Sequence, residues 1–261
     1  MKTIKIFLLS CLVFFSFSIE ASPEALAAFS AEVYINAADD TLLYRLLEPE
    51  RKCFLQKYPL VIFLHGSGER GNDNERQLIW GAGAFIQEDN RKDYPCYVIA
   101  PQCPSGKRWL EQHWALNSHE MPEDPSKTMA LVMELIDKAI DEYPINERRI
   151  YVMGLSMGGY GTWDLISRLP EKIAAAVPVC GGADEKQAPK LIDMPIWVFH
   201  GADDTVVPTF RSQNIVKAIK DAGGTKIKYT EYPGVGHGSW KLAFADPEMM
   251  KWMFSQKKKS K

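Results

Sequence analysis

Arg149-Ile-Tyr-Val-Met-Gly-Leu-Ser-Met-Gly-Gly-Tyr-Gly-Thr-Trp-Asp164 is the stretch around which the rest of the chain can be interpreted. Ile150 to Met153 is a short apolar run of strand character, and helical spacing resumes from Tyr160 to Leu169. Between them, glycines flank a serine, and a Cβ at either glycine would crowd the neighbouring strand and helix. The stretch therefore predicts a strand, a sharp turn with Ser156 at its apex, and a helix.

A serine on such a turn stands exposed above a sheet edge, which is the arrangement of a nucleophile elbow. The alternative interpretation is a glycine-rich turn that only packs a helix on a strand. An elbow also requires two backbone N–H donors for an oxyanion. We expect one from Met157, directly after the serine. The other should follow the apolar run 59–64, where Ser67 is our choice and Gly68 the alternative.

An elbow serine needs partners later in the chain, in the order acid and then histidine. Asp203 and Asp204 follow the apolar run 195–199, and His237 follows the run 226–230. Serine is a weak nucleophile until a base removes its proton, and a buried carboxylate must hold that base in the right tautomer. His237 is therefore the predicted base, and either aspartate is a candidate acid.

The other histidines are weaker candidates. His65 and His200 each follow a strand and precede glycine, so we expect them to hold loops by hydrogen bonds. His113 and His119 fall in the irregular segment 103–125, where a surface position is expected.

Apolar runs and helical patterns alternate from residue 59 onward, which predicts an α/β fold with a mostly parallel, twisted sheet and helices on both faces. Residues 32–36 and 42–47 flank a turn and predict an N-terminal β-hairpin. With 261 residues, 46% of them hydrophobic, the chain can build one sizeable core. We expect a single domain over residues 22–261.

The N-terminus reads as a targeting segment, because Lys2 and Lys5 precede a short apolar stretch, residues 6–17. This pattern predicts a signal peptide over residues 1–21, too short for a stable membrane span, and hence a secreted or periplasmic protein. Cleavage after Ser18 and lipid attachment at Cys11 are the alternatives. The net charge of −2 gives no reason to expect nucleic acid as a partner.

In combination, five stretches resemble the secreted esterase and predicted-peptidase group of the α/β-hydrolases. That group is related to dienelactone hydrolases, phospholipase/carboxylesterases, and feruloyl and polyhydroxybutyrate esterases. The stretches are Tyr58–Gly71, Ala100–Pro104, Arg149–Asp164, His200–Pro208 and Tyr232–Trp240.

The resemblance implies the α/β-hydrolase fold, a Ser156, Asp204, His237 triad, and neither a metal nor an organic cofactor. It favours Asp204 over Asp203, because the acid of related hydrolases commonly stands two residues beyond His-Gly and before Val-Pro. In a hydrolase sheet, Cys53 and Cys96 both precede parallel strands at one edge, and we expect a disulfide between them.

The substrate is less constrained. Only residues 180–194 separate two strands where this fold often carries a lid, so we expect an open site. Trp109 and Trp114 lie on a loop at the ligand-binding edge and are predicted to wall the substrate, unless they only pack the loop. The expected activity is cleavage of carboxylic esters, including acyl, feruloyl or acetyl esters of carbohydrates. A serine peptidase and a non-catalytic binding protein on this scaffold are the alternatives.

Overall fold

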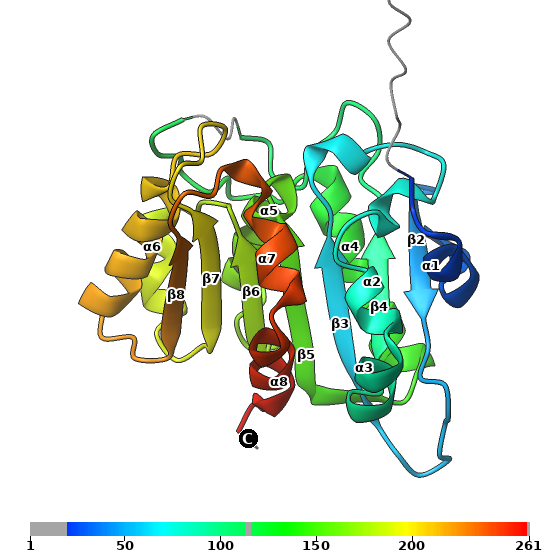
Figure 1. The fold of residues 1–261 in the computed structure, drawn as a ribbon. Helices are drawn as coiled ribbons and strands as arrows, with labels where there is room; N and C mark the ends of the chain where they lie inside the picture. Colours follow the sequence, from blue (N-terminus) through cyan, green and yellow to red (C-terminus); the bar gives the residue numbers. More distant parts are fainter. Residues whose placement is uncertain (1–19, 113–115, 260–261) are drawn as a thin grey trace, which may run out of the picture.

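The computed structural model describes residues 20–112 and 116–259, and an eight-stranded sheet of order β1-β2-β4-β3-β5-β6-β7-β8 forms its centre (Figure 1). The strands are β1 (Ser30–Ile35), β2 (Thr41–Leu47), β3 (Tyr58–Leu64), β4 (Tyr97–Pro101), β5 (Ile145–Leu155), β6 (Ala175–Val179), β7 (Ile196–Gly201) and β8 (Ile227–Tyr232). The β1–β2 hairpin joins β4 antiparallel, and all pairs from β4 to β8 are parallel. The predicted fold class and hairpin are confirmed.

Helices cover both faces of the sheet, as Figure 1 shows. One face carries α4 (Lys127–Glu142), α5 (Met157–Arg168) and α6 (Phe210–Asp221). The other carries α1 (Pro23–Ala28), α2 (Gly83–Ile86), α7 (Trp240–Ala245) and α8 (Pro247–Ser255), with the short α3 (Glu88–Asp93) beside them. Each layer buries its own apolar cluster against the sheet, so the strands between β3 and β7 are apolar on both faces.

Local chemistry sets the helix ends. The Ser126 hydroxyl accepts the N–H of Met129 and caps α4, whose apolar side chains recur every three or four residues. The region after His237 divides into α7 and α8 because Asp246 caps a new helix and Pro247 supplies its first residue.

The carboxyl ends of the parallel strands meet at one edge of the sheet, the upper edge in Figure 1. The register pairs Leu64 of β3 with Gly154 of β5, and Gly201 of β7 with Tyr232 of β8. The loops after these strands are therefore neighbours, although they are far apart in the sequence. Between β6 and β7 the chain forms only a 3-10 helix, Glu185–Lys190, and no helical lid.

Among residues 20–112 and 116–259, no helix has the length and apolar character needed to cross a membrane. The predicted signal peptide, including Cys11, lies almost entirely outside the described residues. Residues 20 and 21 are described, and Ser22 caps α1 by accepting the N–H of Ala25.

The predicted disulfide between Cys53 and Cys96 is not formed, and all four cysteines of the described residues are free. Cys53 is exposed on the loop between β2 and β3, whereas Cys96 is buried in the apolar cluster beneath β4. Lying near the same edge of the sheet therefore does not bring the two sulfur atoms together.

Candidate active site

Ser156 stands between β5 and α5 on a strained turn, with φ 53° and ψ −116°. The flanking glycines permit this turn. A Cβ on Gly154 would lie 2.4 Å from the carbonyl oxygen of Gly158, and one on Gly158 would lie 1.9 Å from that of Leu64. The helix thus packs backbone against backbone on β3, which leaves the serine side chain at the carboxyl edge of the sheet.

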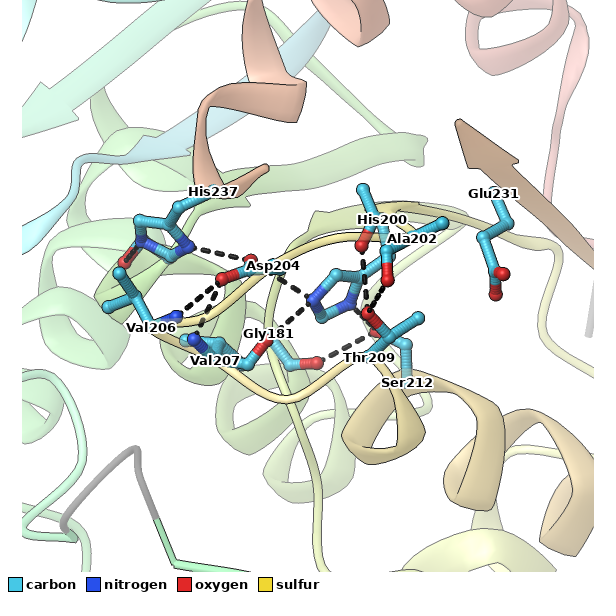
Figure 2. Close-up of polar contacts among 12 residues, drawn as sticks. Gly181, His200, Ala202, Asp204, Val206, Val207, Thr209, Ser212, Glu231 and His237 are labelled. Atoms are coloured by element: carbon cyan, nitrogen blue, oxygen red, sulfur yellow. Dashed lines mark hydrogen bonds and ion pairs between the residues drawn. The ribbon is translucent and has the colours of Figure 1, made fainter. Parts of the chain in front are cut away.

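Two later loops bring a histidine and an aspartate to this serine. The Ser156 Oγ lies 2.9 Å from Nε2 of His237. Nδ1 of His237 in turn lies 2.7 Å from Oδ2 of Asp204 (Figure 2). The Asp204 carboxylate is fully buried, while the His237 side chain keeps 20% exposure. The imidazole is therefore held by a buried carboxylate and remains partly exposed to solvent.

Asp204 is held by its own loop as well. Its Oδ1 accepts the N–H groups of Val206 and Val207, each at 2.9 Å, and its Oδ2 lies 3.2 Å from Nε2 of His200. Burial alone would raise the pKa of Asp204, but hydrogen bonds from the two histidines and the two amides outweigh it and hold this pKa well below its usual range. The carboxylate consequently stays ionised beside His237. The side chain of the neighbouring Asp203 is exposed. Its backbone N–H donates to the Val235 carbonyl.

His65 and His200 hold loops in the structure. His200 is fully buried, with Nδ1 2.8 Å from the Ser212 hydroxyl and Nε2 3.0 Å from the Val207 carbonyl (Figure 2). His65 has Nδ1 2.6 Å from the Gly66 carbonyl, and its Nε2 accepts the N–H of Cys103. Burial lowers the pKa of His65 to about 4.

His119 is not the surface residue that we expected. It is 9% exposed, its Nδ1 lies 2.5 Å from a guanidinium nitrogen of Arg211, and burial followed by this positive charge lowers its pKa to about 4. Arg211 is fully buried and also donates to the carbonyls of Asn117 and Ala183, so it ties the irregular segment to α6. His113 lies outside the described residues.

The two predicted oxyanion donors lie directly after neighbouring strands. Ser67 starts a 3-10 helix (Ser67–Glu69) directly after β3, and Met157 is the first residue of α5. Ser67 stands three residues beyond Leu64, and Met157 three residues beyond Gly154. Because Leu64 and Gly154 are paired in the sheet, the two segments lie side by side. The N–H groups of a first helical turn have no partner within the helix, so α5 itself does not use the N–H of Met157.

Trp109 does not wall the site, and this part of the prediction is wrong. Its side chain is 0% exposed, its Nε1–H donates to the His65 carbonyl at 2.9 Å, and its ring fills the space beside Gly161. The indole therefore packs the loop down against α5. Trp114 lies outside the described residues.

Other residues near Met157 were not foreseen from the sequence. Leu110, Gln112 and Tyr160 line a small pocket together with Met157, and Tyr160 donates its backbone N–H to the Ser156 carbonyl. Trp240 packs edge-on against His237, with ring centroids 5.3 Å apart. Its spacing of three residues from His237 was the available signal.

One group among the described residues has metal-ligand chemistry: Cys180, Asp204 and His237, whose ligand atoms lie within 4.8 Å of one another. Two members already hydrogen-bond each other, and burial raises the pKa of the Cys180 thiol. A thiolate is the form that binds a metal, so the environment disfavours this use. The geometry is suited to proton transfer between Ser156 and His237.

Residues 54–250 match the family model of the phospholipase/carboxylesterases. A crystal structure of a thermostable esterase is 41% identical with a TM-score of 0.84, covering 90% of this chain and 64% of that one. The bifunctional acetylxylan esterase/xylanase of Neocallimastix patriciarum is 28% identical over 167 residues, which is 62% of this chain and 22% of that protein. The acylaminoacyl peptidase of Pyrococcus horikoshii is 16% identical with a TM-score of 0.65, over 90% of this chain and 43% of that one, and it shares the fold. The chain thus spans less than two thirds of each of these proteins.

Proposed function

The chain belongs to the phospholipase/carboxylesterase family, and we propose that it is a serine hydrolase that cleaves carboxylic esters through an acyl-enzyme. The observation that carries this proposal is the continuous contact from Ser156 through His237 to the buried Asp204. Serine becomes a nucleophile only with such a base, and the base keeps its orientation only with such a carboxylate.

In the proposed reaction, Nε2 of His237 takes the Ser156 proton as Oγ attacks the ester carbonyl carbon. The resulting oxyanion accepts the N–H groups of Met157 and Ser67. The His237 imidazolium then protonates the departing alcohol, and the acyl group stays on Ser156. Water, deprotonated by His237, releases the acid and restores the hydroxyl. Asp204 remains ionised throughout and stabilises the imidazolium.

The surroundings of the serine favour a bulky alcohol, because no helical lid lies between β6 and β7. An open site admits an ester attached to a large molecule. Together with the similarity to an acetylxylan esterase/xylanase, these features favour an acetyl or other small acyl ester of a carbohydrate, with feruloyl esters the bulkier alternative.

We further propose that residues 1–21 are a signal peptide and residues 22–261 a single exported domain, with lipid attachment at Cys11 the alternative. The mass of the mature protein, recovered from the periplasm or the medium, tests this. An N-terminus at Ser22 supports it, and a retained Met1 contradicts it.

A fluorophosphonate probe, which reacts with activated serines, tests the nucleophile. The wild-type protein should be labelled on Ser156, and Ser156→Ala should lose labelling and nearly all ester hydrolysis while keeping its melting temperature. Ser167→Ala is the matched control, because this α5 serine only hydrogen-bonds the Trp163 carbonyl. Wild-type turnover in Ser156→Ala would refute the assignment.

A substrate panel separates the esterase from its alternatives. Nitrophenyl acyl esters, acetylated and feruloylated sugars, and aminoacyl anilides should be offered at equal concentration. We expect hydrolysis of the esters and little of the anilides. Preference for anilides indicates a peptidase, and inactivity on every substrate together with failure to label indicates a binding protein.

A further inference from the structure

Two tryptophan rings lie in succession beside His237, the proposed base. Trp240 packs edge-on against His237, and the Trp80 ring lies 6.1 Å from the Trp240 ring at an interplanar angle of 60°. The Lys241 ammonium lies 5.1 Å from the centre of the Trp80 ring. Both indoles are partly exposed and also pack against the apolar cluster on the α7 side of the sheet. They form an edge-on pair of rings that begins at His237.

The position of Trp80 is fixed from two sides. Gly81 has φ 78°, and a Cβ there would lie 2.5 Å from the Phe63 ring, so the backbone packs tightly onto β3. Burial raises the pKa of the Glu69 carboxyl, on the loop that starts with Ser67, and the nearby Trp80 side chain partly offsets this. Trp80 therefore lies between the predicted oxyanion loop and the first turn of α7.

The proposed chemistry places the departing alcohol at this surface. His237 must hand its proton to the alcohol oxygen, so the alcohol group lies on the His237 side of the scissile bond. The acyl group then takes the other side of the scissile bond. Aromatic rings beside an alcohol site offer the flat apolar surface that suits the C–H face of a sugar ring.

We propose that Trp80, together with Trp240, binds the alcohol portion of the substrate, and that this portion is a pyranose ring. The inference rests on the proposed function and adds a residue, Trp80, that determines specificity for the leaving group. Lys241, exposed beside Trp80, is placed to hydrogen-bond a sugar hydroxyl.

A second group of two tryptophans and a lysine serves as a control for the proposed binding site. Trp197 of β7 and Trp252 of α8 pack edge-on with ring centroids 5.4 Å apart, and Lys228 lies 4.6 Å and 5.6 Å from their centres. This is again two indoles and a lysine. It differs in place, because α8 and the start of β7 lie at the lower end of the sheet in Figure 1, opposite the serine.

The experiment compares an acetate ester of a simple alcohol with an acetylated sugar. Ethyl acetate has no ring to stack, and tetra-O-acetyl-xylopyranose presents a sugar; acetate release is followed in a pH-stat. Trp80→Ala should raise KM for the sugar ester about tenfold more than it raises KM for ethyl acetate. Trp80→Phe should retain most of the affinity, and Trp252→Ala should leave both substrates unaffected. Melting temperatures confirm that each variant is folded.

Two results overturn the inference, and they are distinguishable. If Trp80→Ala changes both esters by the same factor, or neither, the ring only packs the loop, and the esterase assignment stands. If the wild-type protein hydrolyses neither ester, the proposed function fails, and the inference falls with it. Calorimetric titration of xylotriose into Ser156→Ala, with and without Trp80→Ala, adds a readout without turnover: equal binding by both proteins also overturns the inference.

Discussion

Nδ1 of His237 lies 2.7 Å from Oδ2 of Asp204, while the adjacent Asp203 is exposed to solvent. The two aspartates therefore predict different kinetics. Asp204→Asn should lower turnover by up to ~10⁴-fold, because an amide at this position favours the wrong imidazole tautomer. Asp203→Asn removes a similar charge from the same loop and should cost far less. Rates on one nitrophenyl ester decide this, and a crippled Asp203→Asn beside an active Asp204→Asn would make Asp203 the acid.

Trp109→Ala should act on stability rather than on substrate choice. The indole is fully buried and hydrogen-bonded to the His65 carbonyl, and truncating a buried tryptophan typically costs about 3–5 kcal/mol. Urea unfolding should therefore shift to lower denaturant, with the ratio of rates on two esters unchanged. Trp109→Phe should recover part of the loss. A changed ester ratio at unchanged stability would return Trp109 to the substrate site.

His65 should make the protein less stable in mild acid. The folded imidazole has a pKa of about 4, against an ordinary value of 6.5, because it is buried and, to a smaller extent, lies near the Arg70 charge. The unfolded chain binds this proton first as the pH falls. The stability is therefore fully present above pH 6.5 and declines toward pH 4, by roughly 3 kcal/mol.

Urea unfolding at several pH values measures that decline, and nitrogen NMR of the imidazole reports its protonation. His65 should remain neutral at pH 5. A protonated His65 ring at pH 5 in the folded protein, or an unfolding free energy that is flat from pH 7 to pH 4.5, would contradict this account.

Cysteine accessibility tests the absence of the disulfide. Cys53 is exposed and should react with iodoacetamide in the native protein. Cys96, Cys103 and Cys180 are buried, and burial raises the pKa of the Cys96 and Cys103 thiols to about 12, so they should react only after unfolding. Peptide mapping identifies the modified residues. A Cys53 that stays unmodified until reduction would instead support a disulfide.

The sequence predicts those parts of the fold that depend on local pattern. Alternating apolar runs gave the parallel sheet, and the glycines around Ser156 gave the turn, because both signals lie within a few residues. The contacts that hold the candidate site join residues far apart in the sequence, so local pattern does not predict them. The partners of His119 include Arg211, 92 residues away, and nothing near His119 in the sequence signals a buried guanidinium.

Trp109 shows that the sequence could not distinguish two roles for the same residue. An aromatic residue on an irregular loop at the ligand-binding edge can either wall the site or pack the loop. Only the position of Gly161, which leaves room for the ring, decides between them. Likewise, Cys53 and Cys96 precede neighbouring strands, yet side-chain direction and burial separate them. Shape complementarity between distant segments is not encoded in any one stretch.

The three proposed catalytic side chains follow β5, β7 and β8, and Ser156 contacts a residue 81 positions away. Contacts of such sequence separation close late in folding, because a long loop must be ordered before they form. Regain of ester hydrolysis during refolding therefore marks completion of the β5-to-β8 half of the sheet. Tryptophan fluorescence, to which Trp163 on the helix directly after the serine contributes, need not wait for that step. The interval between the two signals would measure how long the chain exists with its helices packed and its active site unassembled.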